Sequence, residues 1–282
     1  MRALAEFVMR GKAQAIAIAM LAIATDIFAW AGASIVALVI LRRGVKEGIT
    51  VLLWSSLPAM VLAMWGDVSP LAGLLGTAAV AIVLRMTVSL PLALVAAVLS
   101  GVVTGLALSL FAKPYIEEVV RFIAELFTQL QNQAGAEAAS YLQAPNATQV
   151  LGFLGLGNTI TVVTCLIIAR WWQAMLYNPG GFRQEFHGLR LTPPLTVLLL
   201  VMGIAMSLLG PDYRFWAFIV VVPFVFAGFA LVHSVVAQKQ LSGHWLGFFY
   251  MVWLFLDPLK LLLVLVVIAD SWIDIRGRIA KA

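Results

Sequence analysis

Charged residues are scarce in this chain. Only 11% of the 282 residues are Asp, Glu, Lys or Arg, whereas 63% are hydrophobic. An ordinary soluble domain is about 25% charged and about 45–50% apolar. Because so few polar side chains could not cover a folded surface in water, the composition excludes a cytosolic enzyme, a disordered chain and a secreted disulfide-rich domain. We therefore expect an integral membrane protein.

Residues and motifs of catalytic or metal chemistry are also missing. The single cysteine, Cys165, excludes an intramolecular disulfide, and His187, His233 and His244 are too scattered to suggest a metal site. No His-Glu-x-x-His helix, Gly-x-Ser-x-Gly elbow or Walker A loop is present. The sequence thus predicts no enzyme, cofactor or metal, and any ATP-driven process would need a separate subunit.

Cations outnumber anions, with 18 Lys and Arg against 13 Asp and Glu. They occur in short groups between apolar runs, as the positive-inside rule for membrane proteins describes. Nucleic-acid-binding proteins instead gather their cations on one face. We expect the lipid bilayer as a partner, and no nucleic acid.

Long apolar runs make up most of the chain. A helix crosses about 30 Å of hydrocarbon with about 20 apolar residues. The runs are also too long, and alternate too little, for the strands of a membrane barrel. We predict an all-α, polytopic transmembrane helical bundle built from the runs 13–41, 49–66, 68–84, 86–112, 148–176, 194–210, 213–237 and 245–269.

The number of helices depends on the first and last runs. If each crosses once, the bundle has eight helices. If 13–28 and 30–41 form a hairpin and the last run bends at Asp257-Pro258, 14 of the 18 Lys and Arg face the cytoplasm. The positive-inside rule favours the second arrangement. We predict nine or ten helical segments, some short, with both termini cytoplasmic and the first segment retained rather than cleaved as a signal peptide.

Segment 113–147 divides the chain into an N-terminal half, 1–112, and a C-terminal half, 148–282. Its residues 114–133 place Ile116, Val120 and Ile123 on one face and Glu117 and Arg121 on the other. This periodicity predicts an amphipathic helix that lies on the membrane surface or on the bundle, on the outer side. A small, polar loop, 134–147, comes after it.

Small residues recur at every fourth position from Ser89 to Ser109, at Ala93, Ala97, Gly101 and Gly105. Such a stripe lets helix backbones approach closely in a membrane. Two interpretations stay open, packing inside the monomer and docking onto a partner or a second copy. Ala15 and Ala19 form a second pair at this spacing.

Polar groups inside apolar runs are candidate ligand-binding residues, because their burial in lipid is costly. Asp26, Asn158 and His233 are in this class. For His233 a purely structural, hydrogen-bonded role is the alternative.

Two charged segments flank the C-terminal half. Segment 180–190, with Arg183, His187 and Arg190, predicts a loop at the lipid headgroups or a coupling surface for a cytoplasmic protein. Near the C-terminus, Asp270 and Asp274 lie one helical turn apart, so their carboxylates repel each other unless cations neutralise them. We predict a charge clamp in which Arg276 and Arg278 fold back onto them or onto the 170–190 segment.

The chain resembles the YybS-like (DUF2232) family of bacterial polytopic membrane proteins. The resemblance rests on four segments, Leu41–Gly48, the helix near 114–133, Phe182–Leu191 and Ala269–Arg276. It implies the bacterial cytoplasmic membrane as the location. The N-terminal part of that family is similar to the S components of energy-coupling-factor transporters, which bind vitamins.

The resemblance also implies roles for individual residues. Gly44 and Gly48 would form the cytoplasmic turn after the first hairpin, and Ala15 and Ala19 would dock onto a transmembrane coupling partner. This chain departs from S components in its additional apolar runs from residue 194 onward.

Two functions are compatible with these observations. The first is a small-molecule capture or transport-type component that needs a partner for energy. The alternative is a non-catalytic membrane scaffold or assembly factor that binds other proteins. A buried polar pocket near the outer side of the N-terminal half would favour the first, and a core filled with Leu, Val and Ala the second.

Overall fold

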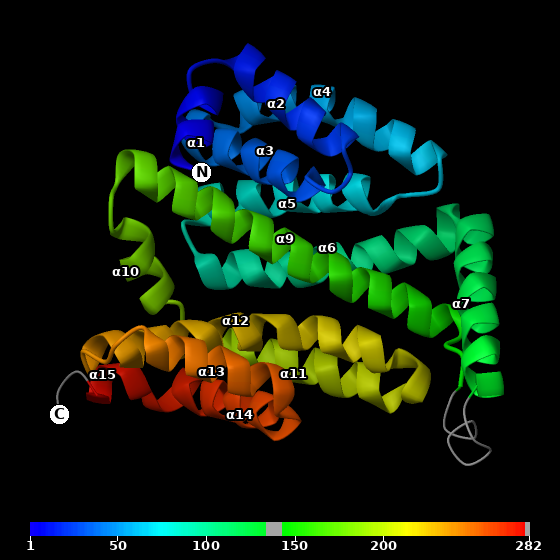
Figure 1. Cartoon of the computed structure of the whole chain (residues 1–282). Coiled ribbons are helices and arrows are strands. Elements are labelled where there is room, and N and C mark those ends of the chain that lie inside the picture. The colour runs from blue at the N-terminus through cyan, green and yellow to red at the C-terminus, as the bar shows by residue number, and fades with distance from the viewer. Residues whose placement is uncertain (134–142, 280–282) are drawn as a thin grey trace.

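A computed structural model describes residues 1–133 and 143–279 (Figure 1). Within these ranges the regular elements are fourteen α-helices and one 3-10 turn, without strands, so the prediction of an all-α helical bundle is confirmed. Five helices are long and apolar enough to cross a membrane, or six if one bent pair forms a span. The chain is an integral membrane protein. Three short helices, α1, α10 and α15, add to the segments that the sequence predicts.

The N-terminal bundle is centred on helix α3. Its members are α1 (Arg2–Val8), α2 (Lys12–Ala24), α3 (Ala29–Arg43), α4 (Val45–Met64), α5 (Ser69–Thr87) and α6 (Leu90–Phe111). Residues 31–41 of α3 are all buried, and α3 packs against α2, α4 and α5. The predicted break in the run 13–41 is confirmed, because Asp26 adopts a φ of 55° in the turn between α2 and α3.

Helix α9 (Ala147–Tyr177) joins the two parts of the chain. It contacts α3, α5 and α6 on one side and α12 on the other. The side chain of Asn146 accepts a hydrogen bond from the backbone N–H of Gln149, and the Gln149 side chain accepts one from the Asn146 N–H. This capping box fixes where α9 begins. Most of the predicted loop 134–147 lies outside the described residues.

The C-terminal helices pack on the far side of α9 and α6 (Figure 1). They are α10 (Gly181–His187), α11 (Pro193–Leu208), η1 (Pro211–Tyr213), α12 (Arg214–Gln238), α13 (His244–Phe255), α14 (Asp257–Ile273) and α15 (Ile275–Ile279). Helices α13 and α14 meet at a bend of 113°, with Pro258 in the first turn of α14. The predicted break at Asp257-Pro258 is therefore confirmed.

Helix α7 (Lys113–Gln133) lies across one end of the bundle, at a steep angle to the long helices (Figure 1). Of its residues only Ile116 is buried, while Phe122, Leu126 and Leu130 are exposed. An amphipathic helix with an uncovered apolar face fits the boundary between headgroups and acyl chains. The predicted amphipathic surface helix is confirmed. Helices α1, α10 and α15 lie at the opposite end (Figure 1).

Candidate functional site

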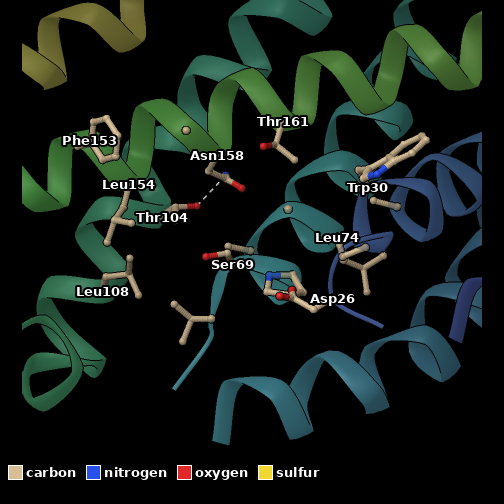
Figure 2. A pocket seen from close by; sticks show the side chains of 17 residues that line it. Asp26, Trp30, Ser69, Leu74, Thr104, Leu108, Phe153, Leu154, Asn158 and Thr161 are labelled. Atoms are coloured by element: carbon tan, nitrogen blue, oxygen red, sulfur yellow. Dashed lines mark hydrogen bonds between the residues drawn. The ribbon is translucent and has the colours of Figure 1, made fainter. Parts of the chain in front are cut away.

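A cavity of about 320 Å³ lies between α3, α5, α6 and α9, at the end of the bundle where α2 turns into α3 (Figure 2). Gly73 on α5 lines it, and a Cβ there would face Thr161 and Asn158. One turn further along α5, a Cβ on Gly76 would come within 2.3 Å of Ser100 Oγ, so glycine lets α5 approach α6 and α9 closely. The absence of these side chains leaves room for polar groups from α6 and α9.

Asn158 is the most firmly held polar residue of the cavity. Its side chain is buried, and Nδ2 donates hydrogen bonds to Thr104 Oγ1 at 3.0 Å and Ser100 Oγ at 3.3 Å. Thr104 can accept because its own hydroxyl donates to the Ser100 carbonyl. Among the described residues no donor reaches Asn158 Oδ1, so this oxygen is available to a donor group on a ligand.

The mouth of the cavity is acidic. Asp26 lies on the α2–α3 turn beside Asp67, and the pKa of Asp26 is raised, first by loss of solvation and then by the charge of Asp67 and a hydrogen bond with it. Asp67 also accepts a hydrogen bond from the backbone N–H of Ser69. No Lys, Arg or His is among the described residues that line the cavity. The site therefore suits a neutral or cationic molecule better than an anion.

The structure separates the three ligand-binding candidates. Asp26 and Asn158 line the cavity, whereas His233 lies on α12 beside a different cavity. His233 Nε2 is 2.9 Å from the hydroxyl of Tyr250, and its ring meets Phe186 edge-on and lies tilted against Tyr250. Helical periodicity gives the face on which a residue lies but not which helix that face meets, so the three residues could not be separated by sequence.

Several residues of the cavity were not predicted from the sequence. Trp30 and Phe153 supply aromatic surface, and Thr104 anchors Asn158 (Figure 2). The available signals were the spacing of Ser100 and Thr104, one turn apart on α6, and the pair Gly73 and Gly76 on α5. Each is too common in membrane helices to identify a site alone.

The stripe of small residues on α6 packs inside the chain. Ala93 and Ala97 are fully buried, and Gly101 and Gly105 face α9. A Cβ on Gly101 would lie 2.5 Å from the carbonyl oxygen of Gly155. In the structure, the stripe therefore packs against other helices of the same chain, which is the first of the two interpretations.

Ala15 and Ala19 are also interior residues, whose exposed fractions are 1% and 0%. They lie on α2, which packs against α3 and α4. The resemblance to S components implies a docking contact with a partner at these positions. That expectation is wrong for Ala15 and Ala19, because a partner could not reach them.

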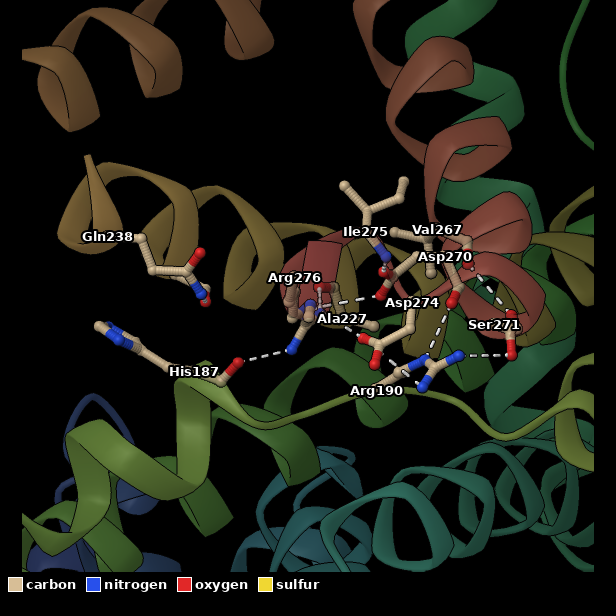
Figure 3. Close-up of polar contacts among 12 residues, drawn as sticks. His187, Arg190, Ala227, Gln238, Val267, Asp270, Ser271, Asp274, Ile275 and Arg276 are labelled. Carbon is tan, nitrogen blue, oxygen red and sulfur yellow. Dashed lines mark hydrogen bonds and ion pairs between the residues drawn. The ribbon is translucent and has the colours of Figure 1, made fainter. Parts of the chain in front are cut away.

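Near the C-terminus, Asp270 and Arg276 form a buried ion pair, whereas Asp274 is exposed (Figure 3). Arg276 Nε lies 3.5 Å from Asp270 Oδ2, and the Arg276 guanidinium donates to the carbonyls of His187 and Ala227. Asp270 Oδ1 accepts a hydrogen bond from the backbone N–H of Ile275. Arg278 has another role, because it donates to the Ile273 carbonyl and to neither carboxylate.

Segment 180–190 is not the loop that the sequence suggested, because Gly181–His187 forms α10. Arg190 turns away from it toward α14 and donates to the carbonyls of Asp270 and Ser271 at 2.8 and 2.9 Å. Arg190 also pairs with Asp274 at 3.6 Å (Figure 3). Arg183 and His187 instead line the cavity beside His233.

Comparison with known proteins found no family model, no curated protein and no solved structure that matches this chain. The function of the chain is therefore inferred from the geometry of its cavities and the distribution of its charges.

Proposed function

We propose that this integral membrane protein captures a small molecule in the cavity between α3, α5, α6 and α9, as a transport-type component that takes its energy from a partner protein. The observation that carries the proposal is a cavity of about 320 Å³ inside the apolar helical bundle, in which Asp26, Asn158 and Thr104 place a few polar groups on a mostly apolar wall. Ligand sites have volumes of about 300–1,000 Å³ and a few polar groups on mostly apolar walls. The resemblance of the N-terminal part to S components supports the same function.

The lining indicates the class of ligand. Asn158 Oδ1 and the Asp26 carboxylate accept hydrogen bonds, while Trp30 and Phe153 offer flat apolar surface. A small neutral or cationic molecule with a hydrogen-bond donor and a ring or short apolar part fits this set. Because the pKa of Asp26 is raised, a cationic ligand is expected to bind more tightly as the pH rises through that pKa and the carboxyl ionises.

The cavity opens at the end of the bundle that carries α7, which we infer is the outer side of a bacterial cytoplasmic membrane. Lys46, Arg85 and Lys239 lie at helix ends of the opposite side, together with α1 and α10 (Figure 1). The positive-inside rule assigns that side to the cytoplasm. Single cysteines at Lys46 and Gln184 should be shielded from an impermeant thiol reagent in intact cells, and one at Glu118 should be labelled. Labelling of a cysteine at Lys46 would show that this end of the bundle faces outward and that the assigned orientation is wrong.

The function is tested by native mass spectrometry after gentle extraction, which detects bound small molecules and co-purifying subunits together. Gly157 lines the cavity, and a Cβ there would meet open space, so Gly157→Leu fills the cavity without a clash. Gly203→Leu on α11 is the matched control, because a Cβ at Gly203 also meets nothing. We expect a small molecule on the wild type and on Gly203→Leu, and its loss from Gly157→Leu.

Asn158→Leu gives a second, independent variant, since it removes the free acceptor oxygen. Retention of the same molecule by both cavity variants would place its binding elsewhere and remove the basis of the proposal. Co-purifying proteins without any small molecule would favour the scaffold or assembly factor instead.

A further inference from the structure

A second cavity, of about 760 Å³, lies between α9, α10, α12 and α13, at the end of the bundle opposite α7. Helices α9 and α10 supply Trp171, Phe182 and Arg183, and α13 supplies Tyr250. Arg2 of α1 reaches it from the N-terminus. None of these residues lines the capture cavity, so the two sites are separate.

Positive charge dominates the polar part of this cavity. Arg183 makes no hydrogen bond and no ion pair with any residue in the described ranges, and Arg2 pairs only through Nε, with Glu6 at 2.8 Å. Among the described lining residues there is no Asp or Glu. Two guanidinium groups thus face the cavity without an acidic partner in its wall.

The remaining wall is apolar and aromatic. Phe182 stacks on Phe186 at 5.7 Å between ring centroids, and Trp171 and Tyr250 are each partly exposed. Helix α13 has no buried residue and contacts α12 chiefly through the edges of aromatic rings, such as Phe229 on Tyr250 at 5.2 Å. The side of the cavity that α13 forms is therefore loosely packed, and most of its apolar side chains are exposed.

We propose that this cavity binds a membrane lipid with a phosphate headgroup, held by Arg183 and Arg2, with its apolar chain along Trp171 and Tyr250. A guanidinium recognises a phosphate through paired, charge-assisted hydrogen bonds. Aromatic rings at the membrane interface pack against the upper part of an acyl chain. A headgroup without net negative charge would leave the Arg183 guanidinium uncompensated, because of these two arginines only Arg2 has an ion pair within the described ranges, with Glu6.

The state of His187 agrees with this arrangement. Partial burial, followed by the charges of Arg183, His233 and Arg276, lowers the pKa of His187. The ring therefore stays neutral near pH 7, where it can donate one hydrogen bond or accept one. The positive charge of the cavity therefore comes from the arginines alone, and a bound anion would neutralise it.

The test is a lipid titration of the purified full chain, monitored by native mass spectrometry. The probes are phosphatidylglycerol, phosphatidylcholine with identical acyl chains, and inorganic phosphate. The variant is Arg183→Gln, and Lys239→Gln is its control because it removes an exposed cation outside the cavity. Thermal melting of each protein shows that the variants are folded.

We expect wild type and Lys239→Gln to prefer phosphatidylglycerol over phosphatidylcholine. Arg183→Gln should weaken binding of phosphatidylglycerol about tenfold, the loss of one charge-assisted hydrogen bond. Equal binding of the two lipids, or equal affinities for the two variants, would overturn the proposal. Inorganic phosphate that displaces the lipid at millimolar concentration would identify a soluble phosphate compound as the ligand and overturn the assignment to a lipid.

Discussion

The two parts of the molecule hold their helices together by different means. In the N-terminal bundle, α3 is buried along residues 31–41 without a single charged side chain, and α6 meets α9 at glycine. In the C-terminal part, α14 and α15 are fixed to α12 and to the end of α10 by Asp270, Arg276 and Arg190. Within lipid, helices gain no hydrophobic energy from association, so close packing and polar contacts must hold them. The buried ion pair of Asp270 and Arg276 is the clearest feature of the second part, whereas the charged contacts of the first part, such as Arg85 with the Leu41 carbonyl, lie at the ends of its helices.

The difference predicts how each part responds to substitution. A network of buried charges fails when one member is removed, because the remaining charge has no partner. A close contact between two helix backbones is disrupted when a larger side chain is introduced at the contact. A polar substitution elsewhere on the helix does not disturb that contact. Single substitutions in each part should therefore separate the two kinds of sensitivity, and the expected losses of stability differ in size.

Removal of Arg276 should have the largest effect. Arg276→Met leaves the carboxylate of Asp270, exposed by 1%, without its cation. Breaking a buried pair in this way costs about 3–5 kcal/mol, whereas replacing both partners by apolar residues is often close to neutral. We expect a large loss of stability for Arg276→Met and a partial recovery for the double variant with Asp270→Leu, measured by unfolding in detergent.

A double-mutant cycle separates the ion pairs of this network. Coupling is expected between Asp270 and Arg276, and between Asp274 and Arg190, but not between Asp274 and Arg278. The exposed pair of Arg2 and Glu6 serves as the control, since pairs of that kind contribute about 0–1 kcal/mol. A coupling energy of zero for Asp270 with Arg276 would show that the buried pair does not hold this part of the fold.

The sequence predicted where helices begin and break better than how they meet. Pro258 predicts the break between α13 and α14, and the length of the run 13–41, which exceeds one membrane span, predicts the break between α2 and α3. Both signals depend only on residues close together in the sequence. Repulsion between Asp270 and Asp274 predicts the clamp with Arg276 and Arg278 as its cations, but it does not identify Arg190 as the partner of Asp274. A contact between distant segments leaves no periodic signal in one sequence.

Added bulk at Gly101 should have the next largest effect. A Cβ there would lie 1.9 Å from Thr159 Oγ1 and 2.5 Å from the Gly155 carbonyl oxygen. The carbonyl belongs to the α9 backbone and cannot rotate away, so Gly101→Leu must separate two helices. Overpacking costs about 1–3 kcal/mol. Thermal melting in detergent should show this loss, and a wild-type melting curve would mean that α6 and α9 adjust freely.

Gly203→Leu is the control for the same change in open space, since a Cβ there meets no atom within 4 Å. Leu99→Met, on the exposed face of α6, tests a change of shape away from the stripe. Both should melt like the wild type.

A smaller effect is expected at the contact between α12 and α13. Tyr250→Phe removes the hydroxyl that lies 2.9 Å from His233 Nε2 and keeps the aromatic contact with Phe229. One neutral hydrogen bond contributes about 0.5–1.5 kcal/mol, and less where it is partly exposed. We expect little change in global unfolding but faster hydrogen exchange in residues 244–255, because α13 has no buried residue to hold it. Unchanged exchange would mean that ring packing alone fixes α13.

The smallest effect is expected on the outer face of α2, where the close-packed bundle ends. Ala17 is exposed, whereas Ala19 is fully buried against α3, whose Gly32 could not carry a Cβ because it would lie 2.9 Å from the Ala19 carbonyl oxygen. Substitutions on an exposed face usually change stability by no more than about 0.5 kcal/mol. Ala17→Leu should therefore melt like the wild type, while Ala19→Leu, two residues away, should lose stability by overpacking. If both substitutions were harmless, α2 would be only loosely attached to α3. If Ala17→Leu were harmless to the purified chain but removed a co-purifying subunit, the exposed face of α2 would be the docking surface, two residues from the position that the resemblance implies.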